Sequence, residues 1–142
     1  MNLSELLINL HINILYFLRL IAKKNHLSIQ QVLCVYSIPI DGITQTNLAN
    51  SLAIDVSTLS RNLDKLLLLN IIYKRSVPED ERFVKIFLTS YGKTIFKHII
   101  HDLNVYCKHM NLNHNNLDNQ SIVDSLSQLN WNLLTNKIKD EY

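Results

Sequence analysis

The sequence predicts a mainly α-helical fold that carries one small β-hairpin. Only two glycines and two prolines occur in 142 residues, and a chain dominated by tight turns needs more of both. Hydrophobic residues make up 47% of the chain and recur at helical spacing along most of it, which is enough for a core and argues against global disorder. Two short segments near the middle alternate as strands do. At this length we expect one domain with helical extensions.

The first expected helix covers residues 3–24 and is apolar on more than one side. Besides its main face, Ile8, Ile12 and Leu15 form a second apolar face. A helix with two apolar faces is buried on both of them. In so short a chain, we expect a second subunit to cover the extra face.

The composition also bears on where the protein works. The N-terminal segment has no basic start and no small-residue cleavage site, and polar residues such as Asn9 and Arg19 keep its apolar runs below the ~18 residues of a membrane span. Cys34 and Cys107 lie far apart, without the spacing of a disulfide framework or a metal site. These features favour a cytoplasmic protein that does not enter a membrane.

Three shorter helices are expected next. Ser28 caps the second helix, which ends near Ser37 because Pro39 follows. Thr44 is the expected N-cap of the third helix. The inward side chains of the second helix are expected to be Ile29, Val32, Leu33 and Tyr36.

The fourth helix follows a turn at residues 53–55 and is expected to start at Val56 or Ser57. Asn70 ends it, since asparagine tolerates the left-handed conformation that usually needs glycine at this place. Its inward side chains are expected to be Leu59, Leu63, Leu66 and Leu67.

A charged hairpin follows this helix pair. Strands are expected at residues 71–76 and 83–88, joined by residues 77–82. Eight of the 14 lysines and arginines lie between Arg61 and Lys97, although the net charge is only +2. A helix pair followed by a basic hairpin has the shape of a winged helix-turn-helix, which places one helix in a DNA major groove and the wing in the minor groove beside it. The alternative is that these charges form a mixed, solvent-exposed surface without a binding role, which is the more common case for a basic cluster outside such a hairpin.

Two further helices complete the chain. Thr89 is expected to cap the fifth helix, which runs to about Met110. Residues 111–120 contain five asparagines and are expected to form a loop. Ser121 is expected to open the last helix. The apolar face of that helix consists of Ile122, Leu126, Leu129 and Leu133.

The middle of the sequence resembles the MarR family of bacterial and archaeal winged-helix regulators. Members carry a pattern like S-T-L-S-R-x-L-x-x-L-x-x-x-G and two hydrophobic residues, then D-x-R, a strand and L-T-x-x-G. Here residues 57–66 read STLSRNLDKL, residues 80–82 read DER and residues 88–92 read LTSYG, in the same order and spacing. The flanking helices also agree in number and place, so the resemblance covers most of the chain. Asn70 stands where the family usually has glycine.

The resemblance implies an obligate homodimer and a single domain over residues 1–142. Dimerisation helices would lie in residues 1–26 and 93–142, and residues 28–92 would form the winged-helix DNA-binding lobe. Two such lobes would meet successive grooves of a pseudo-palindromic site on double-stranded DNA.

The fourth helix is expected to contact DNA through its first turns. Hydroxyl side chains and free backbone N–H groups at a helix N-terminus suit phosphate oxygens. Arg61 is long enough to reach guanine O6 and N7, and Asn62 can address adenine. The alternative is that Ser57 is only the N-cap and Arg61 is only solvated. The candidate residues are Ser57, Thr58, Ser60, Arg61, Asn62 and Lys65.

The hairpin supplies a second set of candidate DNA contacts. Arg82 is expected at its tip, where a guanidinium can enter the negative potential of a narrow minor groove. In the family, an aspartate two residues earlier fixes the direction of this arginine, and the resemblance assigns that role to Asp80. The alternative is an exposed ion pair worth under ~1 kcal/mol. Flanking basic residues expected to meet phosphates are Lys74, Arg75 and Lys85.

Related proteins bind phenolic ligands in an apolar crevice between the dimer base and the lobe. By their placement, His11, Tyr16, Phe17 and Tyr36 are candidates to line such a crevice, with membership of the core as the alternative.

Two pairs of residues are possible sensors. His98 and His101 are spaced to share a metal on one helix, as in some MarR-type zinc sensors, yet no further ligand is clearly placed beside them. One family branch senses oxidants with a cysteine in its first helix, and here Cys34 and Cys107 lie elsewhere, so buried packing is the default for them. We therefore expect no metal and no cofactor.

No catalytic motif, phosphate-binding glycine loop or nucleophile constellation is present, so we do not expect an enzyme. We expect a homodimeric, sequence-specific DNA-binding transcriptional regulator, a repressor whose affinity a small-molecule effector modulates by changing the spacing of its recognition helices. One alternative is a winged-helix regulator without an effector, such as an activator. Another is a winged helix that binds only proteins.

Overall fold

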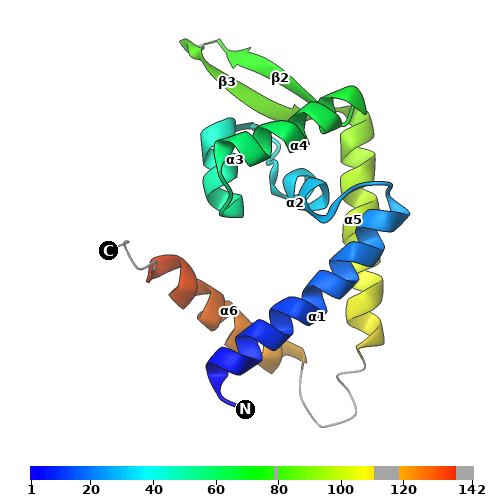
Figure 1. Cartoon of the computed structure of the whole chain (residues 1–142), viewed down its shortest axis with the longest axis vertical. Helices are drawn as coiled ribbons and strands as arrows, with labels where there is room; N and C mark the ends of the chain where they lie inside the picture. Colours follow the sequence, from blue (N-terminus) through cyan, green and yellow to red (C-terminus); the bar gives the residue numbers. More distant parts are fainter. Residues whose placement is uncertain (79, 111–118, 137–142) are drawn as a thin grey trace. The chain divides into compact units, whose positions relative to one another are not determined.

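A computed structural model describes residues 1–78, 80–110 and 119–136, with side chains for all of them except 80–82. The chain forms two compact units, Met1–Tyr106 and Cys107–Tyr142. The first unit contains most of the helices and the sheet, and the second contains the last helix (Figure 1). In chain order the elements are α1 (Leu3–Lys24), α2 (Ile29–Ser37), β1 (Ile43–Thr44), α3 (Gln45–Leu52), α4 (Val56–Leu68), β2 (Ile72–Val77), β3 (Asp80–Leu88), α5 (Ser90–His109) and α6 (Asn119–Thr135).

The expected caps hold most helix starts in place. Ser28 and Gln31 form a capping box on α2, in which Ser28 Oγ accepts from Gln31 N at 3.2 Å and Gln31 Oε1 accepts from Ser28 N at 2.9 Å. Thr44 Oγ1 accepts from the backbone of α3, and Thr89 Oγ1 accepts from Gly92 N at 2.9 Å at the start of α5. The predicted boundaries of α1 to α5 are thereby confirmed to within about two residues.

The predicted inward face of α2 is wrong in part. Tyr36 is 54% exposed, whereas Cys34 and Val35 are fully buried. The buried stripe of α2 is wide because the helix packs against α1, α3 and α4 at once, so its period does not single out one face.

The sheet has three antiparallel strands in the order β1-β3-β2, and the short strand β1 was not predicted. Ile43 pairs with Ile86, and Ile72 pairs with Leu88. The hairpin is longer than expected, because pairing continues through an irregularity at Ser76/Val77 to the pair Val77 and Asp80. The predicted joining segment 77–82 is therefore too long. Val77 belongs to β2 and the backbone of residues 80–82 belongs to β3.

The core of the first unit lies where α2, α3 and α4 meet the sheet and α5. On α4, the predicted leucines Leu59, Leu63 and Leu66 are completely buried, and Leu67 is half-buried. Ile86 from β3 and Ile99 from α5 are also buried in this core. Because one side of α4 is fixed by these contacts, the residues on its opposite side are exposed to solvent. The helix lies next to the β2–β3 hairpin in the chain fold (Figure 1).

A tight joint connects the end of α4 to the start of α5. Asn70 adopts the left-handed conformation with φ of 56°, as predicted. Thr89 Oγ1 donates to Asn70 O at 2.7 Å or to Ile71 O at 3.1 Å, and Thr89 N donates to Ile71 O at 3.0 Å. A Cβ on Gly92 would lie 2.0 Å from Ile71 O, so only glycine fits there. The L-T-x-x-G motif thus has a structural role at this joint.

Two helices carry exposed apolar surface. On α1 only Ile21 and Ala22 are buried, and by length and composition alone this helix is apolar enough to cross a membrane, with a mean hydropathy of 1.4. Its last turn, through Ile21 and Ala22, packs into the core. Large exposed apolar residues of α1 are Leu3, Leu6, Ile8, Leu10, Ile12, Ile14, Tyr16 and Leu20.

Within its own unit, α6 buries none of its described side chains. The expected apolar face is present, with Leu126 and Leu133 more than half exposed. The helix starts at Asn119 rather than Ser121, and Gln120 Nε2 donates to Asp124 Oδ1 at 2.8 Å across its first turn. Of the predicted loop 111–120, residues 111–118 lie outside the described residues, and the last two are helical.

Candidate nucleic-acid interface

The structure brings all six predicted α4 residues together on the first two and a half turns of one helix. Ser57, Arg61 and Lys65 are exposed and follow one another at intervals of four, so they form a row along the solvent side. Thr58, Ser60 and Asn62 are half-buried beside this row. The side-chain amide of Asn62 donates to Thr58 O at 3.1 Å, and among the described residues its carbonyl oxygen has no hydrogen-bond donor.

Asp55 caps α4, and sequence reasoning missed it as part of this site. Its carboxylate accepts from the backbone N–H of Thr58 at 2.7 Å and from the hydroxyls of Ser57 and Thr58. The Ser57 hydrogen bond first, and then those from Thr58, hold the pKa of Asp55 well below its usual value. The signal was present, because aspartate is among the preferred N-cap residues.

Asp55 changes what the two hydroxyls can recognise. A hydroxyl has one proton, and Ser57 and Thr58 both donate theirs to the carboxylate. Each hydroxyl oxygen can then still accept a hydrogen bond but has no proton left to donate. This arrangement fits the amino groups of adenine and cytosine in a major groove better than it fits phosphate oxygens.

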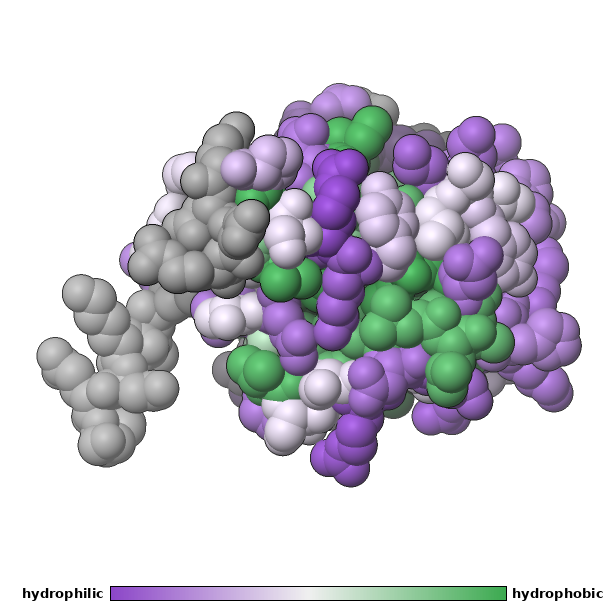
Figure 2. All heavy atoms as spheres, turned by 90° about the horizontal axis from the view of Figure 1, so that it is seen from above, coloured by the Kyte–Doolittle hydropathy of each residue, from purple (hydrophilic) through white to green (hydrophobic). Residues whose placement is uncertain are grey.

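The wing places basic side chains on both faces of the hairpin. Arg75 and Lys85 are register partners, so they lie side by side on one face, and Lys74 lies on the other. The guanidinium of Arg75 lies 4.9 Å from the centroid of the Phe87 ring, and Lys85 Nζ donates to Asp41 O at 3.4 Å. Seen from the side of the wing, the surface mixes hydrophilic residues in purple with hydrophobic ones in green (Figure 2).

The Asp80–Arg82 pair stays a prediction. The backbone of both residues lies in β3, and their side chains lie outside the described part of the structure. The expected position of Arg82 at the hairpin tip is corrected, since two residues of β3 precede it after the turn.

The four candidate ligand residues lie in different surroundings in the single chain, and their shared crevice stays a prediction. His11 and Tyr16 are exposed on α1, where the Tyr16 ring meets Phe17 edge-on at 5.9 Å. Phe17 also lies against Tyr106 of α5, with centroids 5.2 Å apart. Tyr36 instead lines a separate pocket with Phe96, Tyr73 and Phe87, which we call the aromatic pocket.

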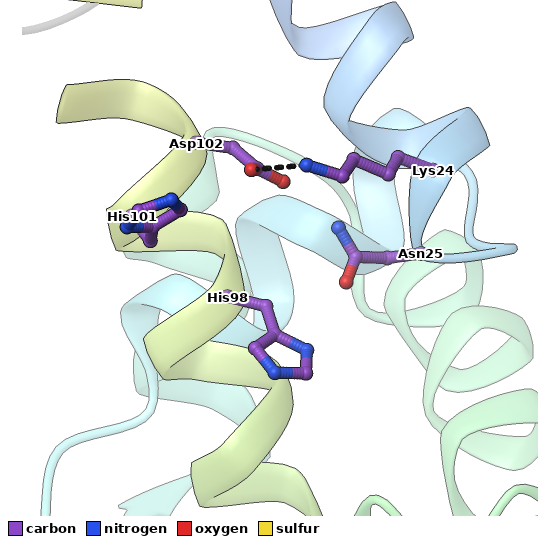
Figure 3. Close-up of a pocket in the computed structure, with 5 residues that line it drawn as sticks. All are labelled: Lys24, Asn25, His98, His101 and Asp102. Carbon is purple, nitrogen blue, oxygen red and sulfur yellow. Dashed lines mark hydrogen bonds and ion pairs between the residues drawn. The ribbon is translucent and has the colours of Figure 1, made fainter. Parts of the chain in front are cut away.

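A smaller pocket contains both candidate metal-binding histidines. His98 and His101 of α5 line it with Lys24 and Asn25, which follow one another where α1 ends (Figure 3). Lys24 Nζ lies 2.6 Å from Asp102 Oδ1, and this ion pair ties α1 to α5. Among the described residues, no three or more histidine, cysteine, aspartate or glutamate side chains are grouped to hold a metal ion.

The two cysteines lie in different environments. Cys34 is fully buried in α2, and burial raises the pKa of its thiol to about 11. Cys107 is exposed on α5. The default expectation of a packed, apolar cysteine therefore describes Cys34 and not Cys107.

The fold has many relatives among solved structures. No protein-family model matches the sequence, and no curated protein does. A MarR crystal structure aligns with a TM-score of 0.80 and 20% identity, covering 95% of this chain and 92% of that one. Apo MarR from E. coli aligns with a TM-score of 0.75 and 21% identity over 94% and 97% of the two chains.

A third match carries a bound nucleic acid. It is a MepR mutant from S. aureus bound to an oligodeoxyribonucleotide, with a TM-score of 0.60 and 18% identity over 95% of this chain and 98% of that one. The matches span nearly the full length of both chains. This chain therefore has the fold of the MarR family of winged helix-turn-helix transcriptional regulators.

Proposed function

We propose that this protein is a sequence-specific DNA-binding transcriptional regulator. The observation that carries the proposal is the two-sided character of α4. Leu59, Leu63 and Leu66 are completely buried, while an exposed row on its other side consists of Ser57, Arg61 and Lys65. A helix held this firmly can present a fixed row of side chains to a major groove. The paired cations Arg75 and Lys85 on the adjacent wing suit the phosphates of the neighbouring backbone.

The protein acts as a homodimer on a pseudo-palindromic promoter site. Large apolar residues are exposed in series along α1 and also on α6, and such exposed apolar surface marks interaction sites. A second copy covers this surface in the proposal, with residues 1–26 and 93–142 as the dimer base and 28–92 as the DNA-binding lobe of a single domain. The MepR complex with DNA supports the use of this fold for DNA binding.

In this proposal the protein is cytoplasmic and represses transcription by occupying the promoter. A small-molecule effector controls its affinity for DNA. An effector acts only if it binds the two spacings of the recognition helices with different affinity. A regulator without an effector, or a module that binds only proteins, predicts that no small molecule releases DNA.

The test is fluorescence anisotropy with DNA from upstream of the gene, against scrambled DNA of equal length at several salt concentrations. We expect a preference of about 10³-fold or more for the native sequence. Arg61→Ala and Arg82→Ala should lose it. Arg61→Lys keeps the positive charge but lacks the planar guanidinium that can donate two hydrogen bonds to one guanine. This variant should still bind DNA, but it should no longer discriminate between bases at one base pair.

Lys23→Gln, at an exposed position on α1, is the matched control and should bind as the wild type does. Equal and weak binding to both DNAs, unchanged in Arg61→Ala, would refute DNA recognition by α4 at this site. In that case a protein partner becomes the better explanation.

A further inference from the structure

One face of the β2–β3 hairpin carries a stack of three side chains that ends at a cation. It is the face opposite the buried Ile86, and Tyr73 pairs there with Phe87 across the two strands. The two rings are stacked, with centroids 5.3 Å apart and planes 17° apart. The guanidinium of Arg75 lies over the same Phe87 ring, 4.9 Å from its centroid, which is within the distance of a cation–π interaction.

The Phe87 ring is confined by the turn that leads into β1. Gly42 N donates to Pro39 O at 3.0 Å and closes this turn, and Gly42 has a φ of 73°. A Cβ on Gly42 would lie 2.6 Å from Cε1 and Cζ of the ring, closer than real Cβ atoms come to other atoms. The ring therefore occupies space that only a glycine leaves open, between the turn and the side chains of β2.

The same turn also contacts the second cation of this face. Lys85 Nζ donates to Asp41 O at 3.4 Å, and Lys85 is the register partner of Arg75. Among the described residues neither cation forms an ion pair with a carboxylate, and the N–H groups of Arg75 have no acceptor. The turn of residues 39–42 therefore positions one cation directly and the other through Phe87, and leaves both able to bind an anion.

We propose that Phe87 is a positioning residue for DNA binding. It holds the Arg75 guanidinium beside Lys85 so that the two cations bind one phosphate of the DNA backbone, and this role rests on the proposed function. The donors of a guanidinium lie in its plane, so stacking on a ring leaves them available for a bidentate contact with phosphate oxygens. An exposed arginine without the ring loses more rotamer freedom when it binds, and this loss lowers affinity.

The test is a double-mutant cycle on DNA affinity, because Phe87 is inferred to act only through Arg75. Fluorescence anisotropy with the DNA from upstream of the gene compares the wild type with Phe87→Leu, Arg75→Gln and the double variant. Leucine keeps an apolar side chain but has no ring face for the guanidinium. A matched control cycle uses Lys74→Gln, on the opposite face of the same strand, in place of Arg75→Gln. Thermal melting checks that each variant folds.

We expect Phe87→Leu to lower the affinity for the native DNA by about two- to fivefold, the size of an exposed cation–π interaction. The same loss should occur in the Lys74→Gln background and should be absent in the Arg75→Gln background, where no guanidinium remains to be positioned. Arg75→Gln should also reduce the slope of log Kd against log salt concentration by about one. A purely structural role of Phe87 predicts equal losses in all three backgrounds, and that result, or no loss in any of them, overturns the proposal.

A measurement without DNA separates the failure of this proposal from the failure of the proposed function. In NMR spectra of the free protein, the ring current of Phe87 should shift the side-chain protons of Arg75 upfield, and Phe87→Leu should remove this shift. If the shift is present but the wild type does not bind its DNA with preference, the proposed function fails and the role of Phe87 in DNA binding fails with it. If the wild type prefers its DNA but the cycle shows no coupling between Phe87 and Arg75, the proposed function stands and the positioning role is refuted.

Discussion

Replacing Gly92 with alanine should break the joint between α4 and α5. A Cβ at this position would lie 2.0 Å from the backbone oxygen of Ile71, and real Cβ atoms essentially never come closer than 3.0 Å. The two groups have to separate by at least 1.0 Å, the difference between those distances. That separation stretches both hydrogen bonds from Thr89 to Ile71 O, now 3.0 and 3.1 Å, beyond bonding distance.

The expected loss is about 2–4 kcal/mol. Forcing an extra methyl group into a packed site costs about 1–3 kcal/mol, and each lost hydrogen bond costs about 0.5–1.5 kcal/mol. Alanine recovers about 1 kcal/mol through its higher helix propensity. For a chain of this length, the loss corresponds to a fall in melting temperature of about 10 °C.

Urea denaturation followed by far-UV circular dichroism measures this loss, at one fixed protein concentration because a dimer's stability depends on it. Ser90→Ala, in the same first turn but exposed, is the control and should change stability by less than about 0.5 kcal/mol. If Gly92→Ala is as stable as Ser90→Ala, the close approach to Ile71 is not a constraint and the explanation of the motif is wrong.

Three further predictions concern charge and burial. The pKa of Asp55 is lowered on folding, so its contribution to stability is complete at pH values above the ordinary aspartate pKa of about 3.9. This contribution is lost as the pH falls below that value. Asp55→Asn should therefore have a lower melting temperature than the wild type at neutral pH, and the two melting temperatures should converge in acid. A thiol reagent that releases a chromophore should label Cys107 in the native protein and Cys34 only after denaturation. The absorbance of the released chromophore should therefore correspond to one thiol per native chain and two per denatured chain. Lys24→Met should destabilise the fold by about 1–3 kcal/mol, because it leaves the Asp102 carboxylate buried without its partner. Urea titration measures this loss, and the double variant Lys24→Met/Asp102→Leu should be more stable than Lys24→Met. If the double variant is no more stable, the buried carboxylate is not the cause of the loss.

The sequence was a good guide wherever local chemistry decides the structure. The capping side chains of Ser28 and Thr89 accept hydrogen bonds from backbone N–H groups only three residues later. Such local contacts predict a helix start without knowledge of any tertiary contact. Asn70 was identified in the same way, because few residues other than glycine tolerate its backbone conformation. The buried leucines of α4 followed from helical periodicity.

Features that depend on distant partners could not be predicted. β1 has two residues and exists only because Ile43 meets Ile86 across more than forty positions of the sequence. Tyr36 was placed inward by its period, but the packing of α2 on three helices buries Cys34 and Val35 instead. The aromatic pocket was missed because three separate elements assemble it, and only Tyr36 had been singled out.

The joint at Thr89 and Gly92 has a mechanical consequence. The carbonyl of Ile71 is shared between the exit from α4 and the entry to α5, so the two helices cannot turn independently. A displacement of the start of α5 is therefore transmitted directly to the end of α4.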